Sequence, residues 1–161
     1  MAKSPDPNTK LTSSNGVTRT LDDWATIFQL CLVVLPPRPE AQMFVPIARR
    51  IFHVLGDADC RTVYCVVGDE FIARGVLGDA EHEALVLTDP DGSFVESLGL
   101  THLPALVHLR QDTTLVDAAE GWDPVTWQRV ADGVAAAMHW SRPTVAGAGD
   151  PPTTPGWPVN S

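Results

Sequence analysis

The sequence predicts one α/β domain in which a mixed sheet of about five strands is flanked by helices. The chain has 161 residues, of which 44% are hydrophobic, enough to bury one core. Short apolar runs rich in β-branched residues alternate with amphipathic segments, and this alternation is typical of a mostly parallel sheet between helix layers. Two further strand-like runs, separated by a polar turn, add an antiparallel edge.

Both ends of the chain differ in composition from the segment between them. Residues 1–18 are rich in Ser, Thr, Asn, Lys and Pro, without periodicity, and are expected to form an N-terminal tail. Residues 141–161 contain five prolines and three glycines, which excludes a helix or the interior of a sheet. The folded domain is therefore expected over residues 19–140, between two extended tails.

The first half of this domain is predicted to contain two helix–strand pairs. A sequence resembling a capping box at Thr20 begins a short helix that ends near Phe28. The run QLCLVVL (29–35) is continuously apolar, as in a strand covered on both faces. Residues 39–55 place apolar side chains on one helical stripe. A second buried strand is expected over 61–67.

The second half continues the alternation and ends in a hairpin and a helix. Its last helix has Asp123 as N-cap and Pro124 at the first helical position. A backbone N–H at that position would have no partner within the helix, so proline is tolerated there. In chain order, we expect a helix over 70–77, a strand over 83–89, a short helix around 94–98, strands over 105–109 and 114–120, and a helix from 124 to about 138.

Charge and composition exclude several classes of function. A net charge of −9 with scattered basic residues argues against nucleic-acid binding, which needs a positive surface. No apolar run reaches the roughly 18–20 residues of a membrane span. The first residues lack the apolar core of a secretory signal. We therefore expect a cytoplasmic protein, associated with a membrane only through a partner complex.

Cofactors and small ligands are not expected either. The glycines lack the spacing of a phosphate-binding loop. The five histidines are dispersed, and no pair has the spacing of metal ligands with a cysteine or carboxylate.

Three features, in the right order, resemble the thioredoxin superfamily. The first is the strand–loop–helix VVLPPRPEAQMFVPIARRI, with Pro46 at the position of the family's helix proline. The second is LGLTHLPALVHLRQD, in which Pro104 follows Leu103 at the position of the family's cis-proline. The third is Gly121 before the capped final helix. The extra segment before TDPDGSFVESLGL is similar to the peroxiredoxin and TlpA-like branch, and the resemblance spans roughly residues 19–140.

The family's catalytic cysteines are missing from the matching positions. In the family, a Cys-X-X-Cys motif lies at a helix N-terminus, which favours the thiolate. Counting back from Pro46, the two cysteine positions fall on Arg38 and Ala41, and no Cys, Ser or Thr lies between Leu32 and Glu40. Because arginine is not a nucleophile, the sequence predicts that the chain is not an enzyme and needs no cofactor.

The three cysteines of the chain lie elsewhere. Cys31 and Cys65 fall in predicted strands and are expected to be buried. Cys60 and Cys65 would lie about 16 Å apart along an extended strand, too far for a disulfide. A thiol oxidoreductase or peroxidase that uses one of these residues is therefore the third hypothesis for the function.

The resemblance implies a groove beside the cis-proline, whose backbone pairs with an extended peptide. Trp157 lies in the segment PPTTPGWPV, which is either a disordered tail or an arm that docks on a partner. His102 is expected to face the site. The predicted partner-binding residues are Pro36, Pro37, Arg38, Pro39, His102, Leu103, Pro104 and Trp157.

Two functions through protein partners remain open. The first is an accessory subunit, without redox activity of its own, of a larger multisubunit complex, in particular a redox or respiratory enzyme. The second is an assembly chaperone for a redox enzyme such as a hydrogenase. Thioredoxin-like proteins that assist hydrogenase maturation are similar to this chain in the LPALV.LR segment and in a proline-rich tail.

Overall fold

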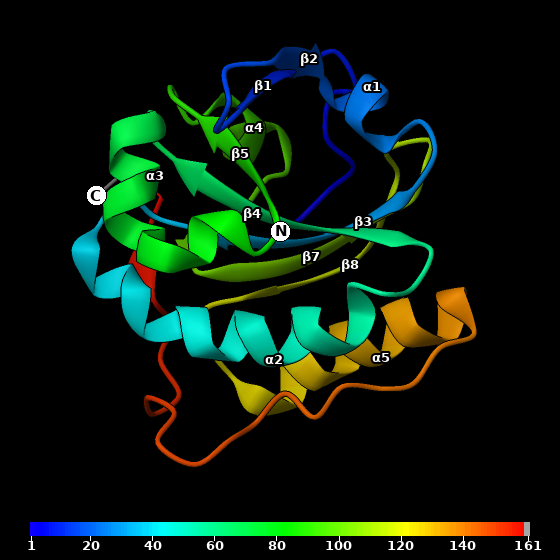
Figure 1. Cartoon of the computed structure of the whole chain (residues 1–161), viewed down its shortest axis with the longest axis vertical. Helices are drawn as coiled ribbons and strands as arrows, with labels where there is room; N and C mark the ends of the chain where they lie inside the picture. Colours follow the sequence, from blue (N-terminus) through cyan, green and yellow to red (C-terminus); the bar gives the residue numbers. More distant parts are fainter. Residues whose placement is uncertain (160–161) are drawn as a thin grey trace.

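A mixed seven-stranded sheet forms the centre of the computed structural model, which describes residues 1–159 (Figure 1). The strand order is β2-β1-β5-β4-β3-β7-β8. Strands β3, β4 and β5 are parallel to one another, whereas the other pairs in the sheet are antiparallel. The strands are β1 (Lys10–Ser13), β2 (Thr18–Thr20), β3 (Gln29–Leu35), β4 (Cys60–Val67), β5 (Leu85–Asp89), β7 (Ala105–Leu109) and β8 (Leu115–Glu120).

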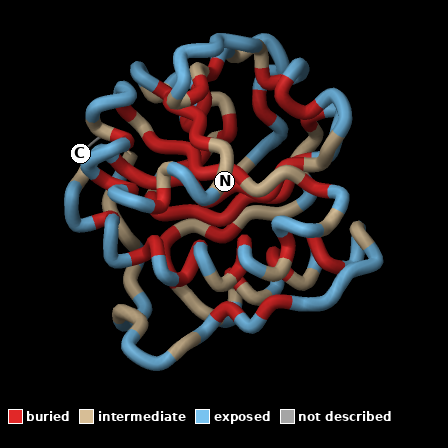
Figure 2. The backbone as a smooth tube through the Cα atoms, in the orientation of Figure 1, coloured by how far each residue is buried: buried red, intermediate tan, exposed pale blue. Residues whose placement is uncertain are grey.

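Helices cover both faces of the sheet. Helices α2 and α5 lie against one face, and α1 and α4 lie on the side of the other face (Figure 1). Each face has its own apolar cluster, and the buried residues concentrate in the strands and on the inner sides of the helices (Figure 2). The helices are α1 (Leu21–Ala25), α2 (Val45–Leu55), α3 (Glu70–Leu77), α4 (Ser93–Ser97) and α5 (Pro124–Met138), with 3₁₀ helices η1 (Pro39–Phe44) and η2 (Gly78–His82).

The residues predicted to cap the starts of the first and last helices do so in the structure. The side chain of Thr20 accepts a hydrogen bond from the backbone of Asp23 at the start of α1. The side chain of Asp123 accepts one from the backbone of Val125 at the start of α5. Strand β3 has the predicted bounds, and burial on both faces explains its continuous apolar run.

The structure differs from the prediction over residues 39–55. Instead of one helix with a proline inside it, the 3₁₀ helix η1 is followed by α2, which begins at Val45. Pro46 therefore lies in the first helical turn, where a backbone N–H has no partner within the helix. It allows α2 to begin there rather than bending it.

The sheet has two more strands than the sequence predicts. Residues 1–18 were expected to be a tail, but β1 pairs with β5, with Thr12 opposite Thr88, and β2 pairs with β1. Leu11 is fully buried in the cluster beneath α1. Burial of one leucine and backbone pairing order a segment whose composition is otherwise polar.

The described part of the C-terminal tail, residues 141–159, runs back along its own domain. It leaves the end of α5, crosses below α2 and returns toward the sheet (Figure 1). Its last described residues form β9 (Trp157–Pro158), which pairs with β6 (His102–Leu103) in a separate two-stranded sheet. The tail thus reaches the predicted cis-proline loop.

Candidate peptide-binding groove

The loop between α4 and β7 carries the predicted cis-proline. The peptide bond between Leu103 and Pro104 is cis, as the resemblance implied. The carbonyl oxygen of Pro104 accepts a hydrogen bond of 2.8 Å from the backbone N–H of Gly121. This bond ties the loop to the segment that leads into α5.

An extended segment lies along this loop, and it is the chain's own tail. Strand β9 is antiparallel to β6, with Trp157 opposite Leu103 and Pro158 opposite His102. The backbone N–H of Val159 donates to the carbonyl oxygen of Thr101 over 2.9 Å. The edge on which the family resemblance places a peptide is therefore occupied by residues 157–159.

Trp157 contacts Arg38, the residue at the position that the resemblance gives to the family's first cysteine. The guanidinium carbon of Arg38 lies 5.5 Å from the centre of the Trp157 ring, and Phe44 meets the same ring edge-on, with 6.0 Å between ring centres. Arg38 is the N-cap residue of η1, and its side chain makes no capping hydrogen bond. The tail and the degenerate motif thus form one contact.

Four of the eight predicted site residues line one groove, and Pro39, His102, Pro104 and Trp157 lie outside its lining. Pro36, Pro37, Arg38 and Leu103 line a groove of about 640 Å³ together with Pro158 and Val159 of the tail. Leu103 belongs to the core cluster beneath α1 and is only 1% exposed, so it forms the floor of the groove. Pro39 begins η1 and is exposed, outside the groove lining.

Glu120, at the end of β8, supports the loop and was not identified from the sequence. One of its carboxylate oxygens accepts from the backbone N–H of Thr101 over 2.6 Å and from that of His102 over 3.2 Å. Its position as the last strand residue before Gly121 is the only signal in the sequence. His102 is half-buried in β6, and its ring contacts the Thr101 hydroxyl.

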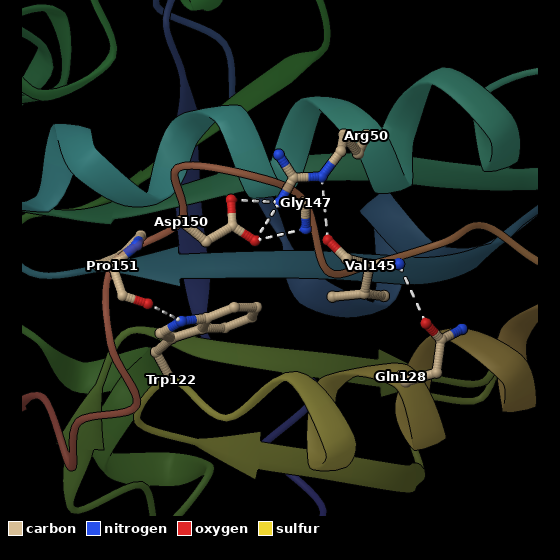
Figure 3. A network of polar contacts seen from close by, with 7 residues as sticks. All are labelled: Arg50, Trp122, Gln128, Val145, Gly147, Asp150 and Pro151. Carbon is tan, nitrogen blue, oxygen red and sulfur yellow. Dashed lines mark hydrogen bonds and ion pairs between the residues drawn. The ribbon is translucent and has the colours of Figure 1, made fainter.

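A polar network fastens the middle of the tail to α2 and α5 (Figure 3). Arg50 of α2 reaches both carboxylate oxygens of Asp150 over 2.6 Å and donates to the carbonyl of Val145 over 3.0 Å. The side chains of Arg50 and Asp150 are 30% and 12% exposed. The Gln128 side chain of α5 accepts from the backbone N–H of Val145 over 3.0 Å. We call these residues the Arg50 anchor.

Trp122 forms the second attachment of the tail. Its indole N–H donates to the carbonyl of Pro151 over 2.9 Å (Figure 3). Its backbone exchanges two hydrogen bonds with that of Thr154, of 2.8 and 3.0 Å. The described tail therefore packs along its own domain and is not a disordered segment. The alternative of an arm that docks on a partner stays a prediction. Contacts that composition cannot show hold it to its own chain.

The three thiols lie away from the groove. Cys31 and Cys65 are fully buried, as expected, and Cys60 is 7% exposed; all three are free. Burial raises the pKa of the Cys31 and Cys65 thiols far above the usual range and that of Cys60 to about 11. At neutral pH these thiols are protonated, the unreactive form. Across residues 1–159, no group of three His, Cys, Asp or Glu residues could hold a metal ion.

Comparison with known proteins shows a likeness in structure. No family model matches the sequence, and no curated protein matches it either. A putative thiol:disulfide interchange protein DsbE from Chlorobium tepidum is 18% identical, with a TM-score of 0.68 over 86% of this chain and 98% of that one. A secreted Mycobacterium tuberculosis disulfide oxidoreductase is 16% identical, with a TM-score of 0.60 over 80% and 96% of the two chains. Peroxiredoxin Q from Xanthomonas campestris is 14% identical, with a TM-score of 0.60 over 83% and 90%.

These structures correct one prediction from the sequence. The prediction that the chain is not an enzyme is wrong, because the proteins with similar structures are thiol–disulfide oxidoreductases and a peroxiredoxin, which are enzymes. Arg38 removes a nucleophile from one site only and says nothing of the rest of the chain. At these identities the likeness shows the fold, and it assigns no reaction to this chain.

The structure and the comparisons bear on location and establish the fold. In the part of the chain that the structure describes, no helix combines the length and the apolar character that crossing a membrane requires. One similar structure is of a secreted protein, so the cytoplasmic location stays a prediction. The chain has a thioredoxin-like fold, and Arg38-Pro39-Glu40-Ala41 lies where the resemblance places the Cys-X-X-Cys motif.

Proposed function

We propose that the chain is an accessory protein that binds an extended segment of a partner protein in the groove beside Pro104. One observation carries this proposal. The edge of the cis-proline loop pairs with an extended segment, since β9 lies antiparallel to β6. Pairing of this kind gives affinity through backbone hydrogen bonds, and adjacent side-chain pockets give selectivity.

The surroundings of the edge suit a peptide rather than a small molecule. The groove beneath the loop is lined by prolines and aliphatic side chains, with Asp91 and Glu96 on the α4 side. Arg38 and Phe44 meet the aromatic ring of the paired segment. Such a surface provides an aromatic contact and a strand edge, the two elements of a small peptide site.

We place the partner in a larger complex, in particular that of a redox enzyme. The support is the fold, because the similar structures belong to proteins that handle thiols and disulfides. One fold serves many functions, so the test identifies the partner directly.

The test is purification of the N-terminally tagged full chain from its native cells, followed by mass spectrometry. We expect a partner at fixed stoichiometry that stays bound through size exclusion, and less of it with Arg38→Ala. Arg49→Ala is the matched control, because Arg49 lies on the exposed side of α2 and pairs with Glu83. Transient binding to an unprocessed precursor would replace the stable subunit by an assembly chaperone. Recovery of no partner would overturn the proposal.

A further inference from the structure

We infer that the cis-proline edge recognises a glycine–aromatic–proline segment, and that Gly156–Val159 is the built-in occupant of this site. A partner would bind by displacing these four residues with a segment of the same pattern. The identity of such a partner rests on the proposed function, but the recognition site and its occupant do not. Each position of the pattern follows from a different contact.

Glycine is required at the first position. Gly156 has φ of +77°, a conformation that side chains rarely adopt. A methyl carbon placed on it would lie 2.2 Å from the carbonyl oxygen of Leu103 and 3.1 Å from the ring of Pro104. Because Leu103 is buried and Pro104 is hydrogen-bonded to Gly121, a side chain at this position would push the segment off the edge.

An aromatic ring is favoured at the second position. Trp157 is half-buried between the guanidinium group of Arg38 and the edge of Phe44. Cationic and edge-on contacts of this type favour an aromatic ring over an aliphatic side chain of similar size. Arg38, at the position that the resemblance gives to a cysteine, therefore contacts an aromatic ring instead.

Proline fits the third position because of the pairing pattern. Val159 directs its N–H toward Thr101, and alternate residues of a strand point their N–H groups to opposite sides. The nitrogen of Pro158 therefore faces away from β6. At such a position the missing N–H of proline costs no hydrogen bond between the two strands. Proline on this outer side also prevents a further strand from adding to β9.

Strand β9 can detach from the edge while the rest of the described tail stays bound to the domain. Strand β9 has only two residues, whereas the Arg50 anchor and Trp122 hold residues 145–154 independently. The segment beyond them is short, so its effective concentration at the edge is on the order of millimolar. A peptide in solution must compete with this tethered segment.

The experiment uses the full chain and a dye-labelled peptide Thr-Thr-Pro-Gly-Trp-Pro-Val, the sequence of residues 153–159. Gly156→Ala removes the internal occupant by the clash with Leu103. Gly149→Ala is the matched control, because Gly149 also has positive φ (+83°) in the same tail but has nothing within 4 Å of an added methyl carbon. Fluorescence anisotropy measures binding, and amide exchange at Val159 reports whether β9 has been released.

We expect faster exchange at Val159 in Gly156→Ala than in Gly149→Ala, and binding of the peptide to the Gly156→Ala chain. Binding to the unaltered chain and to Gly149→Ala should be at least about tenfold weaker, because their own tails compete. Peptides with alanine in place of the glycine or the tryptophan should lose at least about tenfold in affinity. If Gly156→Ala does not fold, Trp157→Ala in the full chain releases the same segment.

Two results would overturn the inference. One is a released and folded variant that does not bind the peptide. The other is equal binding of the peptide to the variant and to the unaltered chain. A failed peptide test with a partner still recovered from cells, and lost with Arg38→Ala, would overturn this inference and leave the proposed function with a partner segment of another pattern. Peptide binding without any cellular partner would keep the site and remove the proposed function.

Discussion

The guanidinium group of Arg38 lies over the indole ring of Trp157, with 5.5 Å between the guanidinium carbon and the ring centre. These residues are far apart in the sequence, and each comes from a segment whose role was uncertain. Arg38 replaces a cysteine that the family resemblance places at this turn, and Trp157 lies in a proline-rich tail. Their contact turns two unexplained features into one site.

This contact predicts the behaviour of an Arg38→Ala variant. Loss of a cation–π interaction worth about 0.5–1 kcal/mol should increase local opening of β9 about two- to fivefold. The measurement is amide exchange at Val159, whose N–H is bonded to Thr101. Arg19→Ala removes a similar contact with Trp24, at 5.0 Å, away from the tail, and should leave exchange at Val159 unchanged. Equal exchange in the Arg38→Ala variant and the unaltered chain would show that the ring needs no cation.

We expect loss of the Arg50 anchor to destabilise the protein more than loss of the adjacent Arg49–Glu83 ion pair. Asp150→Ala removes two hydrogen bonds to a half-buried guanidinium group and one from the backbone of Gly147. We expect a loss of about 1–3 kcal/mol in the free energy of unfolding, measured by urea denaturation.

The adjacent pair provides the control for the anchor. Arg49 and Glu83 are 45% and 44% exposed, and exposed pairs contribute little. Glu83→Ala should therefore cost less than Asp150→Ala. Equal losses would mean that the anchor stabilises the tail no more than a surface ion pair does.

Elements with local signals could be predicted from the sequence. Strand β3 and helices α3 and α5 have the predicted starts, because apolar periodicity and capping residues lie within the elements themselves. The cis-proline position was predicted from family resemblance and is confirmed. Local pattern therefore sufficed wherever neighbouring residues decide the structure.

Elements held by distant partners could not be predicted. Strand β1 contains one buried leucine, and its order depends on pairing with β5. The tail is positioned by contacts such as the one between Arg50 and Asp150, which are 100 residues apart in the chain. Proline and glycine content indicated only that the tail has no long helix or strand, and could not show what it packs against.

The buried thiols predict slow modification in the folded protein. Burial raises the pKa of Cys60, the most accessible of the three, to about 11. At pH 7.5 its thiolate is at least about a hundredfold scarcer than that of a free cysteine. Reaction with an aromatic disulfide reagent should therefore be slow in the native state and should reach all three thiols in denaturant.

A fast-reacting thiol in the native state would contradict this prediction. It would also show a thiol open to exchange chemistry, in keeping with the enzymes whose structures are similar. Single Cys31→Ser, Cys60→Ser and Cys65→Ser variants would then identify the reactive residue.

His108 predicts how stability changes with pH. Its side chain is 1% exposed in β7 and contacts Gln29 through Nε2, with 2.7 Å between Nε2 and Oε1. Burial, together with the charge of Arg110 and against that of Asp117, lowers its pKa from 6.5 to about 4. The unfolded chain thus takes up this proton near pH 6.5, whereas the folded chain does so only near pH 4. Stability is therefore lost as the pH falls through this window.

Comparison with His108→Gln isolates this effect from the carboxylates that titrate over the same range. The unaltered chain should lose up to about 1.4 kcal/mol more per pH unit between pH 6 and 4.5 than His108→Gln does. Urea denaturation at several pH values measures the two slopes. Equal slopes for His108→Gln and the unaltered chain would mean that His108 becomes protonated in the folded protein as readily as in the unfolded one.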